Sequence, residues 1–83
     1  MNPLSREQLR ALMEQVLVAQ QKTLPQGDDA ALQEIGFRSL DFSELALRVE
    51  DETGDELNFE AAGLRQITTV GDVLDLLAEL QAQ

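Results

Sequence analysis

Apolar residues recur with helical spacing in three stretches of the chain. In the first stretch they follow an i, i+3, i+4, i+7, i+8 pattern, which is typical of one helix face: Leu9, Leu12, Met13, Val16 and Leu17. Ser5 followed by Gln8 is a capping-box pattern, and Pro25 cannot continue a helix. The pattern therefore predicts a helix over residues 5–22, with Lys22 in its last turn.

The second stretch predicts a helix over residues 39–53, with Gly54 as its C-terminal cap. A projection at about 100° per residue gives an inward face of Phe42, Leu45, Ala46, Val49 and Thr53. The outward face comprises Leu40, Glu44, Leu47 and Asp51, flanked by Asp41, Arg48 and Glu50. Two leucines among carboxylates suggest a docking surface, although single exposed leucines are ordinary on protein surfaces.

The third stretch begins with a second capping pattern, Thr69 followed by Asp72, and continues with apolar positions Val70, Val73, Leu74, Leu77 and Leu80. A shorter helical turn is expected around residues 59–64. Residues 23–38 form a long connection, whose apolar side chains should pack on the core: Leu24, Leu32 and Ile35. Strand and hairpin signals are absent from the sequence. We therefore expect a single all-α domain over residues 1–83, a small four-helix bundle with three main helices and one short helix.

Composition narrows the possible functions. The 83 residues contain no cysteine and no histidine, which excludes disulfides, thiolate metal sites and a Ser-His triad. The net charge of −10 argues against binding to nucleic acid or to anionic membranes, and favours basic protein partners. Most of that charge lies in residues 39–83, which hold eleven of the sixteen acidic residues and two of the six basic ones. No signal peptide or membrane span is evident, so we expect a soluble cytoplasmic protein.

Ser39 is the main candidate for chemistry, because it lies after Gly36 and at the start of a predicted helix. By itself it could simply cap that helix, since serine is a favoured N-cap residue. However, the run Gly36-Phe37-Arg38-Ser39-Leu40-Asp41-Phe42-Ser43-Glu44-Leu45 resembles the phosphopantetheine attachment motif of acyl carrier proteins. That motif typically reads Gly-x-Asp-Ser-Leu before a helix with a Glu-Leu pair. Two later runs are also similar to the family, Glu50-Asp51-Glu52-Thr53-Gly54 and Gln66-Ile67-Thr68-Thr69-Val70-Gly71-Asp72.

The resemblance implies a free-standing carrier rather than an enzyme. Ser39 would accept 4′-phosphopantetheine from coenzyme A through a separate phosphopantetheinyl transferase, and the arm would hold acyl groups as thioesters. The other implied partners are an acyl-loading ligase or transferase and ketosynthase-type or other acyl-processing enzymes. They would meet a monomeric carrier on its second helix, at Leu40, Asp41, Glu44, Leu47, Glu50 and Asp51.

Arg38 departs from the family pattern, which usually has Asp before the serine. This charge reversal would alter recognition by the transferase, and it favours polyketide or other specialised acyl chemistry. Primary fatty acid synthesis and an aminoacyl cargo are alternatives, and an apolar cleft would favour sequestered long chains. The alternative from another class is an unmodified acidic interaction module in which Ser39 only caps. A catalytic Ser-Lys pair would depend on Lys22, which is distant in the sequence.

Overall fold

The computed structural model describes residues 4–54, 56 and 67–81. These residues form the helices α1 (Arg6–Val18), α2 (Leu32–Ile35), α3 (Ser39–Thr53) and α5 (Val70–Gln81). Within the described ranges there is no strand, only an isolated antiparallel bridge between Ala31 and Thr69. The all-α class is thus confirmed. The short helix expected around residues 59–64 lies outside the described residues.

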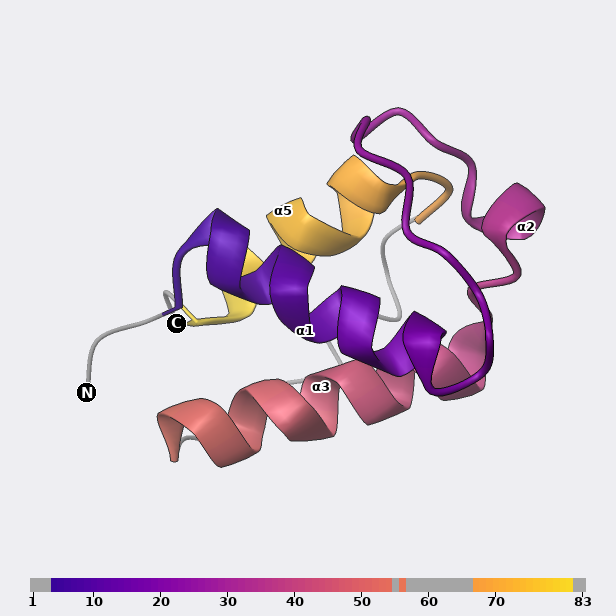
Figure 1. The fold of residues 1–83 in the computed structure, drawn as a ribbon. Coiled ribbons are helices and arrows are strands. Elements are labelled where there is room, and N and C mark those ends of the chain that lie inside the picture. Colours follow the sequence, from indigo (N-terminus) through magenta and orange to yellow (C-terminus); the bar gives the residue numbers. More distant parts are fainter. Residues whose placement is uncertain (1–3, 55, 57–66, 82–83) are drawn as a thin grey trace.

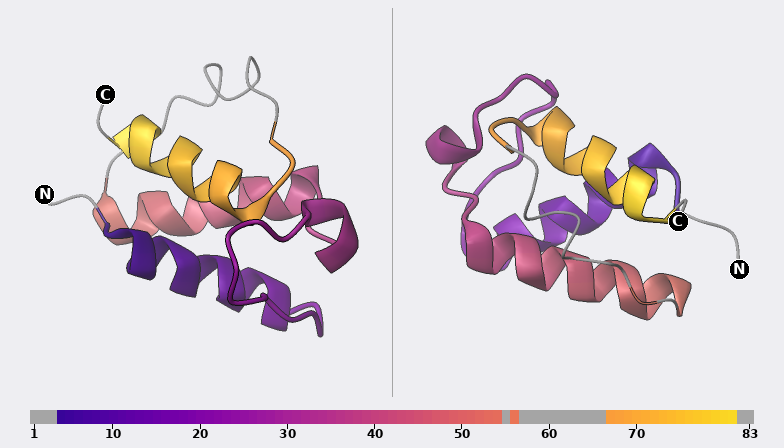
Figure 2. Two further views of the ribbon diagram at one scale, coloured as in Figure 1. Left: turned by 90° about the horizontal axis from the view of Figure 1, so that it is seen from above. Right: turned by 180° about the vertical axis from the view of Figure 1, so that it is seen from behind.

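Helix α1 packs against both α3 and α5 (Figure 1). Both further views show that α3 and α5 run in the same sense and that α1 runs opposite to them (Figure 2). Helix α1 is therefore antiparallel to both α3 and α5, whereas α3 and α5 are parallel to each other. No helix in the described part of the chain has both the length and the apolar character needed to cross a membrane.

The predicted apolar stripes form one hydrophobic core. Every apolar residue predicted for the inner faces of α1 and α5 is buried, and on α3 only Phe42 is half-buried rather than buried. Leu76 is also buried, although it lies outside the predicted stripe of α5. Burying a leucine fully contributes about 1.5–3 kcal/mol, so these stripes stabilise the three-helix arrangement. The two predicted capping boxes, Ser5 with Gln8 and Thr69 with Asp72, are both formed.

Helix α1 is shorter than predicted and ends at Val18. The chain then turns through Gln21, which adopts a left-handed backbone conformation with φ of 63°. The Lys22 N–H donates to the Leu17 carbonyl over 2.8 Å, the kind of bond that closes a Schellman turn. Lys22 is therefore not in the last turn of the helix, and the expectation that it would be is wrong.

The connection between α1 and α3 is fixed to the start of α5 by backbone hydrogen bonds. The Leu32 N–H donates to Thr68 O over 2.9 Å, and the Val70 N–H donates to Ala30 O over 3.0 Å. Leu32 is buried, while Leu24 and Ile35 pack against the core from partly buried positions. The connection therefore packs on the core as expected, but it also contains the helix α2, which the sequence did not predict.

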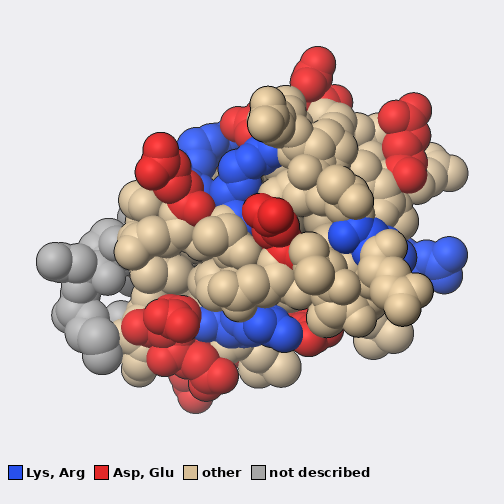
Figure 3. Space-filling model, in the orientation of Figure 1, with Lys and Arg blue, Asp and Glu red and all other residues tan. Residues whose placement is uncertain are grey.

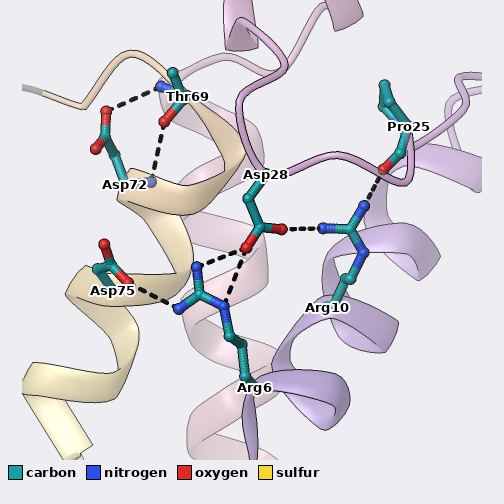
Figure 4. A network of polar contacts seen from close by, with 7 residues as sticks. All are labelled: Arg6, Arg10, Pro25, Asp28, Thr69, Asp72 and Asp75. Carbon is teal, nitrogen blue, oxygen red and sulfur yellow. Dashed lines mark hydrogen bonds and ion pairs between the residues drawn. The ribbon is translucent and has the colours of Figure 1, made fainter.

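Ion pairs reinforce this attachment on the protein surface (Figure 4). The Arg6 guanidinium contacts Asp28 at 2.8 Å and Asp75 at 2.7 Å, and Arg10 contacts Asp28 at 2.7 Å. The hydrogen bond from Arg6 is the main reason why the pKa of Asp28 lies below its usual value. Such exposed pairs contribute little to stability, so they secure the connection rather than drive folding.

Candidate functional site

Ser39 is the first residue of α3, and it does not cap the helix. The N-cap position belongs to Arg38, whose backbone is extended, with φ of −113° and ψ of 179°. The Ser39 side chain is exposed, and within the described residues its hydroxyl forms no hydrogen bond. The reading in which Ser39 serves as the helix cap is therefore wrong. Its hydroxyl is available to another molecule.

Asp41 performs the capping instead. Its carboxylate accepts a hydrogen bond from the Arg38 N–H over 2.9 Å, which satisfies a backbone donor at the start of the helix. The side chain bends back over the first turn and is buried, with 5% of the residue exposed. The prediction that Asp41 flanks the exposed face of α3 is therefore wrong. A helical projection gives the direction of a side chain but not its local hydrogen bonds.

Two residues from the turn after α1 complete a polar cluster around Asp41. Lys22 Nζ donates to Gly36 O over 2.6 Å and to Gln20 Oε1 over 2.9 Å, and it lies 3.8 Å from Asp41 Oδ2. Gln20 Nε2 donates to Asp41 Oδ1. We call Gln20, Lys22, Gly36, Arg38 and Asp41 the Asp41 cluster. It joins the turn after α1 to the turn before α3.

The Asp41 cluster keeps its carboxyl group ionised. Burial by itself raises the pKa of Asp41, because it disfavours the charged form. The hydrogen bonds from the Arg38 N–H and from Gln20 lower it, as do the charges of Lys22 and Arg38. These effects outweigh burial, and the pKa of Asp41 lies below its usual value.

An open hollow of about 920 Å³ lies beside Ser39. Its apolar wall comes from the connection, α3 and the start of α5, and consists of Leu32, Phe37, Phe42, Ile67 and Val73. Ser39, Arg38 and Ser43 line the same hollow from the first turn of α3. The sequence did not predict this feature, because its wall is assembled from three segments that are distant along the chain.

The outward face of α3 carries the two predicted apolar side chains. Leu40 is 84% exposed and Leu47 is 60% exposed, which confirms that part of the projection. Glu44 and Asp51 are exposed beside them, while Glu50 is half-buried. Glu44 also pairs with Arg48, at 3.2 Å between Oε1 and Nη2. The outer face of α3, defined as Leu40, Glu44, Leu47 and Asp51, is thus apolar and acidic.

The turn that leads into Ser39 carries basic residues, in contrast to the acidic outer face of α3. Arg38 precedes it, and Lys22 contacts the Gly36 carbonyl three residues earlier, so two of the five basic residues in the described part lie at the turn before this serine. Figure 3 shows basic side chains at the end of the molecule where α1 finishes and α3 starts. With Asp41 as the opposing charge, the immediate environment is net positive in a protein of charge −10. Such a site suits an anionic group.

Lys22 approaches the Ser39 turn in space, but not as a catalytic base. Its ammonium group donates to two oxygen acceptors and lies near a carboxylate. A base that activates serine needs a free lone pair within hydrogen-bond reach of the hydroxyl. No hydrogen bond joins Lys22 to Ser39 in the described structure. Lys22 therefore acts here as a structural cation.

Comparison with known proteins adds no assignment. No protein-family model matches the chain, and neither curated proteins nor solved structures give a significant match.

Proposed function

We propose that this chain is an acyl carrier protein whose Ser39 hydroxyl carries 4′-phosphopantetheine. One observation carries the proposal: Ser39 presents an exposed hydroxyl, with no hydrogen bond in the described structure, at the first residue of α3. Its sequence surroundings resemble the attachment motif of that family. A structural serine would be expected to use its hydroxyl in the fold, as Ser5 does at the start of α1.

The charge around Ser39 supports attachment of a phosphodiester. The first N–H groups of an α-helix lack partners within the helix, and they form the positive end of its dipole. Phosphate groups are stabilised at such positions. Arg38 directly precedes Ser39, and Lys22 contacts the Gly36 carbonyl in the same turn with Asp41 as its counter-charge. A chain with a net charge of −10 would otherwise repel a further anion.

The apolar lining of the hollow beside Ser39 favours an apolar cargo. A group tethered to Ser39 would begin at the rim of a surface lined by two phenylalanines and three aliphatic residues. An apolar acyl chain could bury part of its surface there, which would protect the thioester end from water. This favours acyl intermediates, in polyketide or other specialised acyl biosynthesis, over a polar aminoacyl cargo.

The outer face of α3 supports contact with partner enzymes. Leu40 and Leu47 would supply apolar anchors, and Glu44 and Asp51 would meet lysine or arginine side chains. The expected partners are a phosphopantetheinyl transferase, a loading enzyme and ketosynthase-type enzymes. Exposed ion pairs contribute under about 1 kcal/mol each and are screened by salt, so each contact should be brief. A carrier that visits several enzymes needs such contacts.

The intact mass of the protein tests the proposal, after incubation with coenzyme A and a broad-specificity phosphopantetheinyl transferase. We expect one phosphopantetheine addition, lost in Ser39→Ala and retained in Ser43→Ala, which alters a serine one turn further along the same helix. An unmodified wild-type protein, in a reaction where a control carrier is modified, would refute the proposal. In that case the remaining hypothesis would be an unmodified interaction module that binds its partner through the outer face of α3.

A further inference from the structure

The backbone before Ser39 is held by residues that lie outside the attachment motif. Lys22 binds the Gly36 carbonyl over 2.6 Å, and Asp41, which receives a hydrogen bond from Gln20, binds the Arg38 N–H. Between these two points Phe37 is buried, and its N–H donates to Leu32 O over 3.0 Å. Each residue from Gly36 to Arg38 thus has a fixed backbone or a buried side chain.

We propose that Gln20 and Lys22 are positioning residues for the modification of Ser39, acting through Asp41 and the Gly36 carbonyl. This inference rests on the proposed function. In that reaction the Ser39 oxygen forms a bond to the phosphorus next to pantetheine in coenzyme A. The bond from that phosphorus to the bridging pyrophosphate oxygen breaks, and adenosine 3′,5′-bisphosphate leaves. The hydroxyl proton passes to a base of the transferase.

The alignment of the serine oxygen controls the rate of such an in-line displacement. A displacement of about 1 Å at a reacting atom can cost on the order of 100-fold in rate. Ser39 has one side-chain torsion, so a fixed backbone limits its oxygen to three staggered positions, and a displaced backbone moves all three. The Asp41 cluster fixes that backbone from α1, while Ser39 itself makes no hydrogen bond in the described structure. The Asp41 cluster therefore holds the backbone before Ser39 without contacting the hydroxyl, which stays accessible.

Steady-state kinetics of phosphopantetheine transfer tests the inference. For Lys22→Met and Gln20→Met we expect kcat to fall about tenfold or more, with the KM for the carrier changed less than about threefold. Lys22→Arg retains a donor that can reach Gly36 O, so it should recover most of the rate. Arg6→Met is the matched control, because it removes a cation from the other end of α1. Its kcat should equal that of the wild type, with circular dichroism showing that each variant is folded.

Three results would overturn the inference: a Lys22→Met rate within about twofold of the wild type, no recovery in Lys22→Arg, or an equal loss in Arg6→Met. The last result would mean that general destabilisation, rather than the Asp41 cluster, slows transfer. Failure of the proposed function is distinguishable, because the wild-type protein would then take no phosphopantetheine. If the wild type and Lys22→Met are modified equally well, only the positioning role fails.

Discussion

The carboxylate of Asp41 accepts a hydrogen bond of 2.9 Å from the backbone N–H of Arg38, three residues earlier in the chain. This contact closes the first turn of α3 and makes Arg38 the residue that precedes the helix. Asp41 at the third helical position thus bonds to the N-cap backbone, and Ser39 takes no part in this capping interaction. The Ser39 hydroxyl is left exposed at the first helical position.

Replacing Asp41 with alanine should destabilise the fold. The change removes the acceptor of the Arg38 N–H and of Gln20, and leaves Lys22 without its nearby carboxylate. Loss of a cap together with a buried hydrogen-bond acceptor should lower the free energy of unfolding by about 1–2 kcal/mol. Urea unfolding followed by circular dichroism measures this change.

The control is Asp51→Ala, which removes an exposed carboxylate from the C-terminal part of the same helix. A negative charge near a helix C-terminus is unfavourable, so this variant should be as stable as the wild type or slightly more stable. Equal unfolding midpoints for Asp41→Ala and the wild type would show that the cap contributes nothing.

Gly36→Ala should also destabilise the protein. Gly36 has a φ of 75°, which costs a residue with a Cβ roughly 1–2 kcal/mol. The added Cβ would also lie 3.1 Å from Lys22 Cε and press on the Asp41 cluster. We expect the free energy of unfolding to fall by about 1–2 kcal/mol in the urea measurement.

Gly27→Ala provides the matched control, because Gly27 is not among the described glycines with positive φ. Its added Cβ would meet only the exposed Asp29 side chain, which can rotate away. Its stability should stay within about 0.5 kcal/mol of the wild type. If both alanine variants were equally stable, the left-handed turn at Gly36 would not be the reason for a glycine there.

Asp72 should contribute stability that depends on pH. Hydrogen bonds from the N–H groups of Thr68 and Thr69 and from the Thr68 hydroxyl hold the pKa of Asp72 below its usual value of 3.8. A lowered pKa in the folded state means that the contribution is present above the usual value and is lost as the pH falls through the lowered one. Thermal unfolding of the wild type and Asp72→Asn, between pH 6 and pH 2.5, measures it.

We expect the wild type to be more stable than Asp72→Asn near pH 6, with the two curves converging at the acid end. The repulsion within the acidic chain also changes with pH, but nearly equally in both proteins, so the difference isolates Asp72. A difference that stays constant down to the lowest pH would contradict the assignment.

Leu47→Gln should leave stability unchanged and weaken partner contact. Leu47 is 60% exposed, so its replacement should alter the free energy of unfolding by less than about 0.5 kcal/mol. Loss of an apolar anchor costs about 1 kcal/mol of binding, which would raise the KM of the transferase for the carrier about fivefold. Val18→Gln is the control, because Val18 is 58% exposed but lies on α1. An equal rise for both variants would argue against the outer face of α3 as the docking surface.

The sequence by itself determined the three long helices, their inner faces and the exposure of Leu40 and Leu47. Each of these follows from the order of apolar and polar residues within one helix, where neighbours three and four positions apart share a face. Capping is equally local, so Ser5 and Thr69 could be recognised from the residues that follow them.

The tertiary structure alone decided how the site around Ser39 is built. Gln20 reaches Asp41 across 21 positions, and Lys22 reaches Gly36 across 14. The wall of the hollow likewise combines the connection with α3 and the start of α5. No periodicity encodes such contacts, because they exist only once α1 has ended early, turned at Gln21 and packed against α3. That is why Asp41 was expected at the surface but is buried, bonded to Gln20 and to the Arg38 backbone.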